Sequence, residues 1–547
     1  MNIIKQASEN IINRLSWATS HKDQAGITRD LAEGKDISEV YGVGEAGLFD
    51  EFFYFLQRFQ ILDLFFALDP NTSKRRSNVQ FPTVILIYLM RVVAGLAFFW
   101  HSHPVLLRSQ PLMRLVGFNG RQIRDGTSRR GSEKASEPTE IRGPICPDSI
   151  AAYIQAISAQ ALEKLINSVV AILAKHHFFP KGIHALLDSS EIQSTERCPG
   201  CGKVKKEKAP ELRLRKGRIR KVMETVFGFK VWLLWDPNSR LPLAIRFDTI
   251  EVSDVTYTRE IITQAVSNLG THAKIVSVAM DRGFLDGRDL WWLHNQMGIH
   301  FYIPAKTNLG VYKDALSLTG TGVVQTRQRK RTVGAGKNRK TVMDSWKVEG
   351  IAGLISAGFY GEQGSGSHEN RKDFLPNPIN AVVVLDDPYR QNNPQSDLLV
   401  ILTNAPVDKP LRVYDGYDAR SEIENGQFRE AKQAWFIDRP ARNTAEGFRS
   451  HVYITLVTMA LTTVFRTWMD EQDKLEHQGK ETGIRKFREQ IKEQNGNKLI
   501  VFDEDRYAIF DTYEVFILCG TTVLKPEGVR ETVSKRDILI KYGVALE

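Results

Sequence analysis

The chain has 547 residues, of which 42% are hydrophobic and 25% are charged, ordinary values for a soluble globular protein of two to four domains. Its four cysteines are too few for a disulfide scaffold and fit a reducing cytoplasm. The net charge of +10 favours a polyanionic partner, although charge alone argues only for non-specific attraction. The first residues, MNIIKQASENIINRL, lack the apolar stretch of a secretory signal.

The first 180 residues are predicted to be mostly helical. Residues 1–46 are polar and read as a weakly ordered arm, and an aromatic-rich helix is expected over 48–68. The apolar run 81–100 is long enough to span a bilayer. Arg91 stands at its middle, where a charge costs at least about 2.5–3.5 kcal/mol. We therefore expect a packed helix and no membrane span.

Two acidic residues end strand-like runs in the middle of the chain. Asp188 closes the run GIHALLDSS, and Asp281 closes IVSVAMDRGF. A carboxylate at the end of a buried strand is a rigid ligand, and hard oxygen donors suit Mg²⁺ or Mn²⁺. Two such ions, about 3.5–4 Å apart, can activate a water or a 3′-hydroxyl and stabilise the leaving oxygen of a phosphodiester.

A third acid lies on the predicted helix YDGYDARSEIENGQFREAKQAWFIDR, residues 414–439. Tyr417, Arg420 and Glu424 fall at i, i+3 and i+7 and share one helix face. A phenol, a guanidinium and a carboxylate are a poor choice for a hydrophobic core. The alternative is a solvated face with an Arg–Glu pair at i,i+4.

Together, strand-end Asp188, the DRGF at Asp281 and the Y-x2-R-x3-E pattern resemble the DDE transposases of bacterial and archaeal insertion sequences, in the group with a Tyr-Arg-Glu-Lys signature. The resemblance spans residues 81–519 and implies an α/β fold with a ribonuclease-H-like catalytic core. It implies Asp188, Asp281 and Glu424 as catalytic residues that hold two Mg²⁺ or Mn²⁺ ions, with Tyr417 and Arg420 as contacts to DNA phosphates.

The same resemblance implies double-stranded DNA as the partner, both as transposon ends and as target, and a homo-oligomer assembled on it. The protein would then be cytoplasmic and associated with the nucleoid. The sequence contains no G-x4-GK[ST] loop, so no nucleotide cofactor is expected. This fits transesterification, which exchanges one phosphodiester for another and needs no nucleotide fuel.

The signature lysine departs from the family spacing. It usually stands seven residues after the glutamate, where this chain has Ala431, and Lys432 stands eight after. At 100° per residue, eight steps leave Lys432 about 80° from Glu424. We hypothesise a π-bulge at Gly426 that absorbs one residue and returns Lys432 to the face as a DNA contact; an unbroken α-helix over 420–432 would refute it.

A basic run follows the Asp188 strand. Residues 203–221 contain ten basic and two acidic residues, a net charge of +8. We read the run as a flexible loop that tracks a phosphate backbone, with a solvated charge run as the alternative. Arg220 and Lys221 in the run, and Lys230 in the strand after it, are the predicted DNA contacts.

Five segments are expected from these signals. They are a helical DNA-binding region (1–180), the first half of the ribonuclease-H-like core (181–308), a β-rich insertion (309–378), the second half of the core (379–475) and a C-terminal appendage (476–547). The 143 residues between Asp281 and Glu424 leave room for the insertion. Its Trp346 could stack on a flipped base, as in some relatives, or be a buried core aromatic.

Other readings stay open at this stage. Cys198 and Cys201 form half a zinc site, and a turn with free thiols is preferred over Zn²⁺. The alternative functions are a metal-dependent nuclease of the same fold without strand transfer, or a domesticated DNA-binding protein that has lost catalysis.

Overall fold

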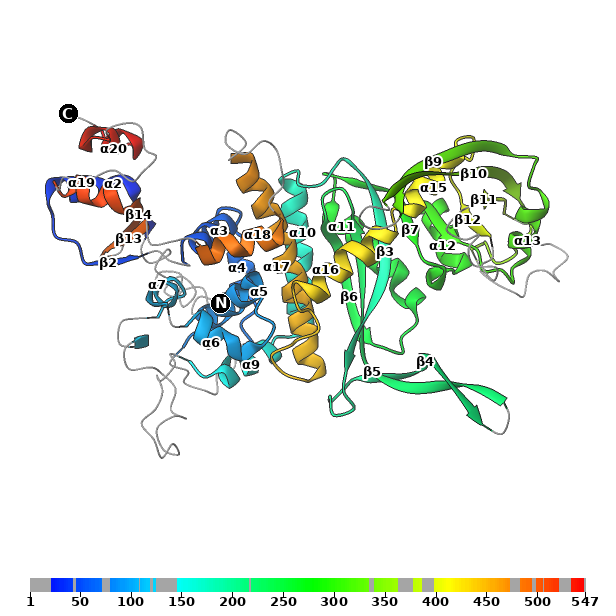
Figure 1. The fold of residues 1–547 in the computed structure, drawn as a ribbon, viewed down its shortest axis with the longest axis horizontal. Helices are drawn as coiled ribbons and strands as arrows, with labels where there is room; N and C mark the ends of the chain where they lie inside the picture. Colours follow the sequence, from blue (N-terminus) through cyan, green and yellow to red (C-terminus); the bar gives the residue numbers. More distant parts are fainter. Residues whose placement is uncertain are drawn as a thin grey trace. The chain divides into compact units, whose positions relative to one another are not determined.

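A computed structural model describes the chain from residue 21 to residue 545 with gaps. The described residues are 21–42, 46–70, 79–107, 109–118, 122–123, 145–215, 218–333, 339–362, 377–385, 398–472, 483–493, 498–504, 506–520 and 533–545. The chain divides into two compact units (Figure 1). One contains residues 166–430, and the other contains residues 1–165 and 431–547.

The unit of residues 166–430 is built on a ten-stranded mixed sheet, with strand order β4-β5-β3-β7-β8-β12-β11-β10-β9 and β6 paired to β5. Its strands are β3 (Gly182–Ser194), β4 (Gly202–Arg215), β5 (Arg218–Asp236), β6 (Leu241–Thr249), β7 (Lys274–Met280), β8 (His300–Pro304), β9 (Val323–Val333), β10 (Lys340–Leu354), β11 (Ile379–Leu385) and β12 (Leu399–Thr403). The helical elements are η2 (Asp254–Tyr257), α11 (Thr258–Leu269), η3 (Arg282–Phe284), α12 (Gly287–Asn295), α13 (Gly310–Ser317), α15 (Pro410–Asp418) and η5 (Ile423–Phe428). The predicted α/β class is confirmed.

Central strands β3, β7 and β8 are parallel, and the other pairings of the sheet are antiparallel. The inner strands are rich in Val, Ile and Leu and nearly fully buried, as expected of strands covered on both faces. Helix α11 makes the crossover that a parallel connection requires. The order of hairpin, helix and parallel strand predicted after Asp188 is therefore present.

The basic run is a β-hairpin and was wrongly expected to be a flexible loop. β4 and β5 pair from Gly202–Gly228 out to Arg215–Arg218, and the hairpin extends away from the rest of the sheet (Figure 1). Paired strands hold the charged residues in register, so one face of the described stem carries exposed Lys203 and Lys205.

The segment expected as an insertion supplies β9 and β10, which form one edge of the same sheet. β9 also contacts the helix that carries the signature tyrosine. The Gln325 side chain accepts a hydrogen bond from the Leu411 N–H at 3.1 Å, and Arg327 pairs with Asp415 at 3.0 Å. This edge therefore supports α15.

The second unit is mostly helical, with packed apolar helices at its centre. Its helices are α3 (Ala46–Arg58), α4 (Ile61–Phe66), α5 (Phe81–Ala94), η1 (Phe99–His101), α6 (Ser102–Val105), α7 (Gln110–Leu115), α9 (Pro147–Gln155), α17 (Ala445–Gln472) and α18 (Ile484–Glu493), while α10 (Ala159–Lys175) and α16 (Arg429–Gln433) cross the boundary between the units. α5 is buried from Phe81 to Val93, which confirms the predicted packed helix. Arg91 is 1% exposed and donates to the Arg439 carbonyl at 2.8 Å.

By length and composition, one described helix, Ala445–Met469, could cross a membrane, and a second would count if the bent pair Pro147–Gln155 and Ala159–Lys175 were one span. In the first, 72% of the apolar window is buried inside the structure. Core helices of globular proteins share this property.

A small domain in the same unit joins the two ends of the described chain. Its sheet has the order β1-β14-β13-β2, so the two strands from residues 498–511 pair with each other in the centre and a strand from residues 21–42 lies on each side of them. The elements are β1 (His21–Lys22), α2 (Gln24–Glu33), β2 (Glu39–Gly42), β13 (Lys498–Asp503), β14 (Arg506–Asp511), α19 (Thr512–Leu518) and α20 (Lys535–Lys541). Residues 21–42 are thus ordered partners of the C-terminal segment, and the expectation of an arm there was wrong.

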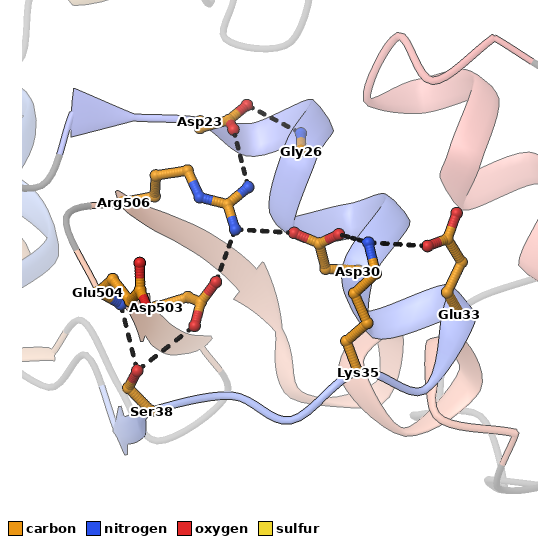
Figure 2. Close-up of polar contacts among 9 residues, drawn as sticks. All are labelled: Asp23, Gly26, Asp30, Glu33, Lys35, Ser38, Asp503, Glu504 and Arg506. Atoms are coloured by element: carbon orange, nitrogen blue, oxygen red, sulfur yellow. Dashed lines mark hydrogen bonds and ion pairs between the residues drawn. The ribbon is translucent and has the colours of Figure 1, made fainter.

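Figure 2 shows the ion pairs that join these two segments. Arg506 on β14 contacts Asp23 at 3.2 Å, Asp30 at 2.9 Å and Asp503 at 2.6 Å. Lys35 pairs with Asp30 from the other side, at 2.6 Å. One guanidinium therefore joins three carboxylates from both segments.

Candidate active site

Strand pairing brings the two predicted aspartates together in the middle of the sheet, where β7 ends. Leu187 of β3 pairs with Met280 of the parallel strand β7; Asp188 is the next residue of β3, and Asp281 directly follows the end of β7. The expectation that the strand ends at Asp188 was wrong, because β3 stays paired with β5 as far as Ser194. The Asp188 side chain is 13% exposed. Its Oδ1 accepts a hydrogen bond from the Ser189 N–H at 2.8 Å, which fixes the carboxylate.

The third carboxylate lies on a π-helix. Residues Ile423–Phe428 form η5, and the Arg429 N–H bonds to the Glu424 carbonyl five residues earlier, the hydrogen-bond pattern of a π-turn. The hypothesised bulge around Gly426 is confirmed. η5 packs against β3, the strand that carries Asp188.

Arg420 lies between two of these acids. Its Nη1 is 3.3 Å from Asp188 Oδ2, and its Nη2 is 3.8 Å from Glu424 Oε2. The guanidinium carbon is 6.0 Å from the centre of the Tyr417 ring, within range of a cation–π contact. The predicted helix face is thus turned towards Asp188, which a face exposed only to solvent would not be.

The surroundings of Asp188 perturb its protonation. Burial is the main cause that raises its pKa to about 6; the charges of Asp281 and Glu424 add to the rise, while Arg420 and the Ser189 N–H oppose it. Perturbed pKa values of this kind are concentrated at functional sites. Within the described ranges, no three His, Cys, Asp or Glu residues lie close enough together to hold a metal ion.

The model of one protein family, the transposase DDE domain, matches residues 180–462. The chain belongs to this family. The match contains both aspartates, the π-helix and Arg420, so the family assignment and the local geometry concern the same part of the transposase.

Other comparisons add little to the site of this transposase. No curated protein matches the chain. A solved structure described as "Cryo-EM structure of piggyBac transposase synaptic complex with hairpin DNA (SNHP)" is similar at 10% identity with a TM-score of 0.34, covering 79% of this chain and 84% of that one.

The predicted DNA contacts have different surroundings. Tyr417 and Arg420 adjoin the acids, and half-buried Lys432 lies on α16, directly after η5. Lys230 is only 11% exposed, and its ammonium is held by Asp254 at 3.0 Å and by the Val252 carbonyl at 2.8 Å. Arg220 and Lys221 lie on β5, but their side chains are outside what the structure describes.

Two further predictions concern the surroundings of the site. Trp346 is 3% exposed and packs edge-on against Tyr414, with ring centres 6.1 Å apart, which favours the core reading. Cys198 and Cys201 are free thiols, and each lies against a nearby carbonyl in one turn. Sequence reasoning missed Asp254 and Ser189, which no motif marks.

Proposed function

We propose that this transposase cuts DNA at the ends of a transposon and joins the freed ends to target DNA at a site formed by Asp188, Asp281 and Glu424. The observation that carries the proposal is the strand pairing that places Asp188 beside Asp281, together with Arg420, which contacts both Asp188 and Glu424. Burial and the neighbouring acids raise the pKa of Asp188, and a buried carboxylate of this kind is costly to ionise unless a cation compensates it.

The donor set fits divalent metal ions in its chemistry. Asp188, Asp281 and Glu424 would supply hard carboxylate oxygens to Mg²⁺ or Mn²⁺. When bound, such ions polarise the phosphodiester and favour an attacking oxygen and a leaving oxygen in line. Asp188 and Asp281 would hold both ions, and Glu424 would complete the ligands of the second ion.

Arg420 and Tyr417 would then position phosphate. Arg420 is shared between Asp188 and Glu424. A guanidinium also binds phosphate oxygens through two parallel hydrogen bonds. When ions neutralise the acids, Arg420 is free to bind the DNA backbone beside the scissile bond. Lys432, brought round the helix by the π-turn, would add a second contact.

The hairpin β4–β5 would extend the DNA-binding surface. Its pairing aligns Lys203 and Lys205 on an exposed face, and a cationic ribbon of this kind binds backbone phosphates without reading sequence. Lys230 is less suited to this role, because its ammonium is held internally.

The chemistry proceeds in two steps at the same acids. Water attacks the phosphodiester at the transposon end and releases a 3′-hydroxyl. That hydroxyl then attacks a target phosphodiester, so the bond formed replaces the bond broken. We further propose an insertion-sequence enzyme of the Tyr-Arg-Glu-Lys group that acts in the cytoplasm as a homo-oligomer on paired ends.

The test is a cleavage and strand-transfer assay with Mg²⁺ or Mn²⁺, using the DNA that flanks the gene as substrate. Glu424→Gln should abolish metal-dependent joining, since it removes one of the three carboxylates. The matched control is Glu422→Gln, two residues away on an exposed position of the same helix, which should retain joining.

Three results would contradict the proposal. Joining that survives Glu424→Gln would remove Glu424 from the site. Cleavage without joining would indicate a nuclease of the same fold. Binding of the flanking DNA with neither reaction would indicate a domesticated DNA-binding protein.

A further inference from the structure

A second acid, Asp254, lies directly behind the proposed site. It begins the short turn η2, and its Oδ1 accepts hydrogen bonds from the Ser189 hydroxyl at 2.7 Å and from Lys230 Nζ at 3.0 Å. Ser189 is the residue after Asp188, and its N–H holds the Asp188 carboxylate. Asp254 is therefore one residue removed from the first proposed metal ligand.

The contact comes from the opposite face of the sheet. Asp188 pairs with Leu233, whereas Ser189 pairs with Trp232 on β5. Because side chains alternate along a strand, Ser189, Trp232 and Lys230 lie on the face away from Asp188. Asp254 thus supports β3 from the face opposite to Asp188.

The same carboxylate also touches the segment that carries the second aspartate. A Cβ placed on Gly283, two residues after Asp281, would lie 2.7 Å from Asp254 Oδ2, and its three nearest atoms would all belong to Asp254. Such an approach is closer than carbon and oxygen tolerate, so a side chain at position 283 would displace the Asp254 carboxylate or the turn. One oxygen of Asp254 faces the β3 segment and the other faces the turn after β7.

Asp254 is itself anchored. Its backbone carbonyl accepts the Trp232 indole N–H at 3.0 Å, and Trp232 is fully buried. Lys230 Nζ is tied to the Val252 carbonyl at 2.8 Å and lies 5.5 Å from the centre of the Trp232 ring. Asp254 therefore cannot move together with Ser189 or Gly283 without breaking its contacts to β5.

We infer that Asp254 is a positioning residue that fixes the spacing of Asp188 and Asp281 by contacting Ser189 and Gly283. Lys230 neutralises and orients it, so the main role of this lysine is inside the protein. The inference rests on the proposed function, since it assumes that the two aspartates hold the ions. Partners behind the direct ligands commonly set metal affinity in this way.

The test measures Mn²⁺ binding to the full chain by electron paramagnetic resonance, with folding checked by circular dichroism. Asp254→Ala should weaken Mn²⁺ binding about tenfold. Asp254→Asn keeps an oxygen for Ser189 and Lys230 and should recover most of the affinity. The matched control is Tyr257→Phe, which removes the hydrogen bond from the same turn to Asp248 and should leave Mn²⁺ affinity unchanged.

A double-variant cycle tests the contact itself. Gly283→Ala should weaken Mn²⁺ binding in the native chain and have little effect in the Asp254→Ala background, because the obstructing side chain is then gone. The inference would be overturned if Gly283→Ala lowered Mn²⁺ affinity equally in the native and Asp254→Ala backgrounds. It would also be overturned if Asp254→Ala and Tyr257→Phe lowered Mn²⁺ affinity equally.

The two proposals fail differently. Mn²⁺ binding that is insensitive to Asp188→Asn and Asp281→Asn would refute the metal site. Binding that depends on both aspartates but not on Asp254 would overturn only the positioning role.

Discussion

Asp188 is predicted to destabilise the metal-free protein at neutral pH. Its pKa is about 6 in the folded chain, against an ordinary value of 3.8, and burial is the largest cause. Ionising this carboxyl in the fold therefore costs about 3 kcal/mol more than in the unfolded chain. Its side chain is 13% exposed, so solvent screening does not remove the effect.

The sign follows from proton linkage. Between pH 4 and pH 6 the unfolded chain loses the Asp188 proton before the folded chain does, so rising pH favours unfolding. The penalty is absent below about pH 4 and complete above about pH 6. Asp188→Asn removes it, and the amide oxygen can still accept the hydrogen bond of the Ser189 N–H, although the amide NH2 that replaces Oδ2 cannot accept from Arg420. We expect the variant to be more stable than the native chain by about 1–3 kcal/mol at pH 8.

The assay is hydrogen exchange of the β3 and β7 segments in EDTA at several pH values, corrected for intrinsic rates, because it reports local opening free energies. Adding Mg²⁺ should stabilise the native chain, by about 2.7 kcal/mol at one hundred times its dissociation constant, and have much less effect on the variant. The reasoning would be refuted if the difference in opening free energy between Asp188→Asn and the native chain became smaller as pH rises from 4 to 8. It would also be refuted if Mg²⁺ left that difference unchanged.

Three further predictions concern other parts of the chain. Trp346→Ala should destabilise the unit of residues 166–430 by about 3–5 kcal/mol, measured by urea denaturation; loss of a DNA step with normal stability would instead support base stacking. Deleting Gly426 should convert η5 to an α-helix and leave the melting temperature of the protein unchanged. Deleting Ala431, which is fully buried, should lower the melting temperature sharply. Arg506→Met should speed hydrogen exchange in β14, because it removes the Arg506 ion pairs of Asp23 and Asp503 and leaves Asp30 with Lys35 alone. Lys35→Met, at a 57% exposed side chain, should change the exchange little; equal effects would contradict the central role of Arg506.

The strands that carry the site were predictable because their signals are local. The runs before Asp188 and Asp281 are continuous and apolar, and burial on both faces of a central parallel sheet demands that composition. The π-turn was also predictable. Lys432 stands one residue farther from Glu424 than the seven-residue spacing of the resembling family, and few changes in a helix absorb one extra residue. These features depend on residues within about ten positions of each other.

The small domain was not predictable for the opposite reason. β1 has two residues and β2 has four, too short for a periodic signal. Each pairs with a strand more than 450 residues away, His21 with Arg506 and Tyr41 with Ile500. A polar segment of this kind is indistinguishable from an arm until its partner strand is known.

Lys230 shows why a charge in the sequence does not by itself identify a DNA contact. In the sequence it is one more lysine after a basic run. In the fold it shares Asp254 with Ser189, and the three residues come from β5, η2 and β3. A positive charge is free for phosphate only where no acid of the same chain has been brought to it, and strand pairing decides this. Lys203 and Lys205, exposed on the hairpin face, are therefore better candidates for binding DNA than Lys230.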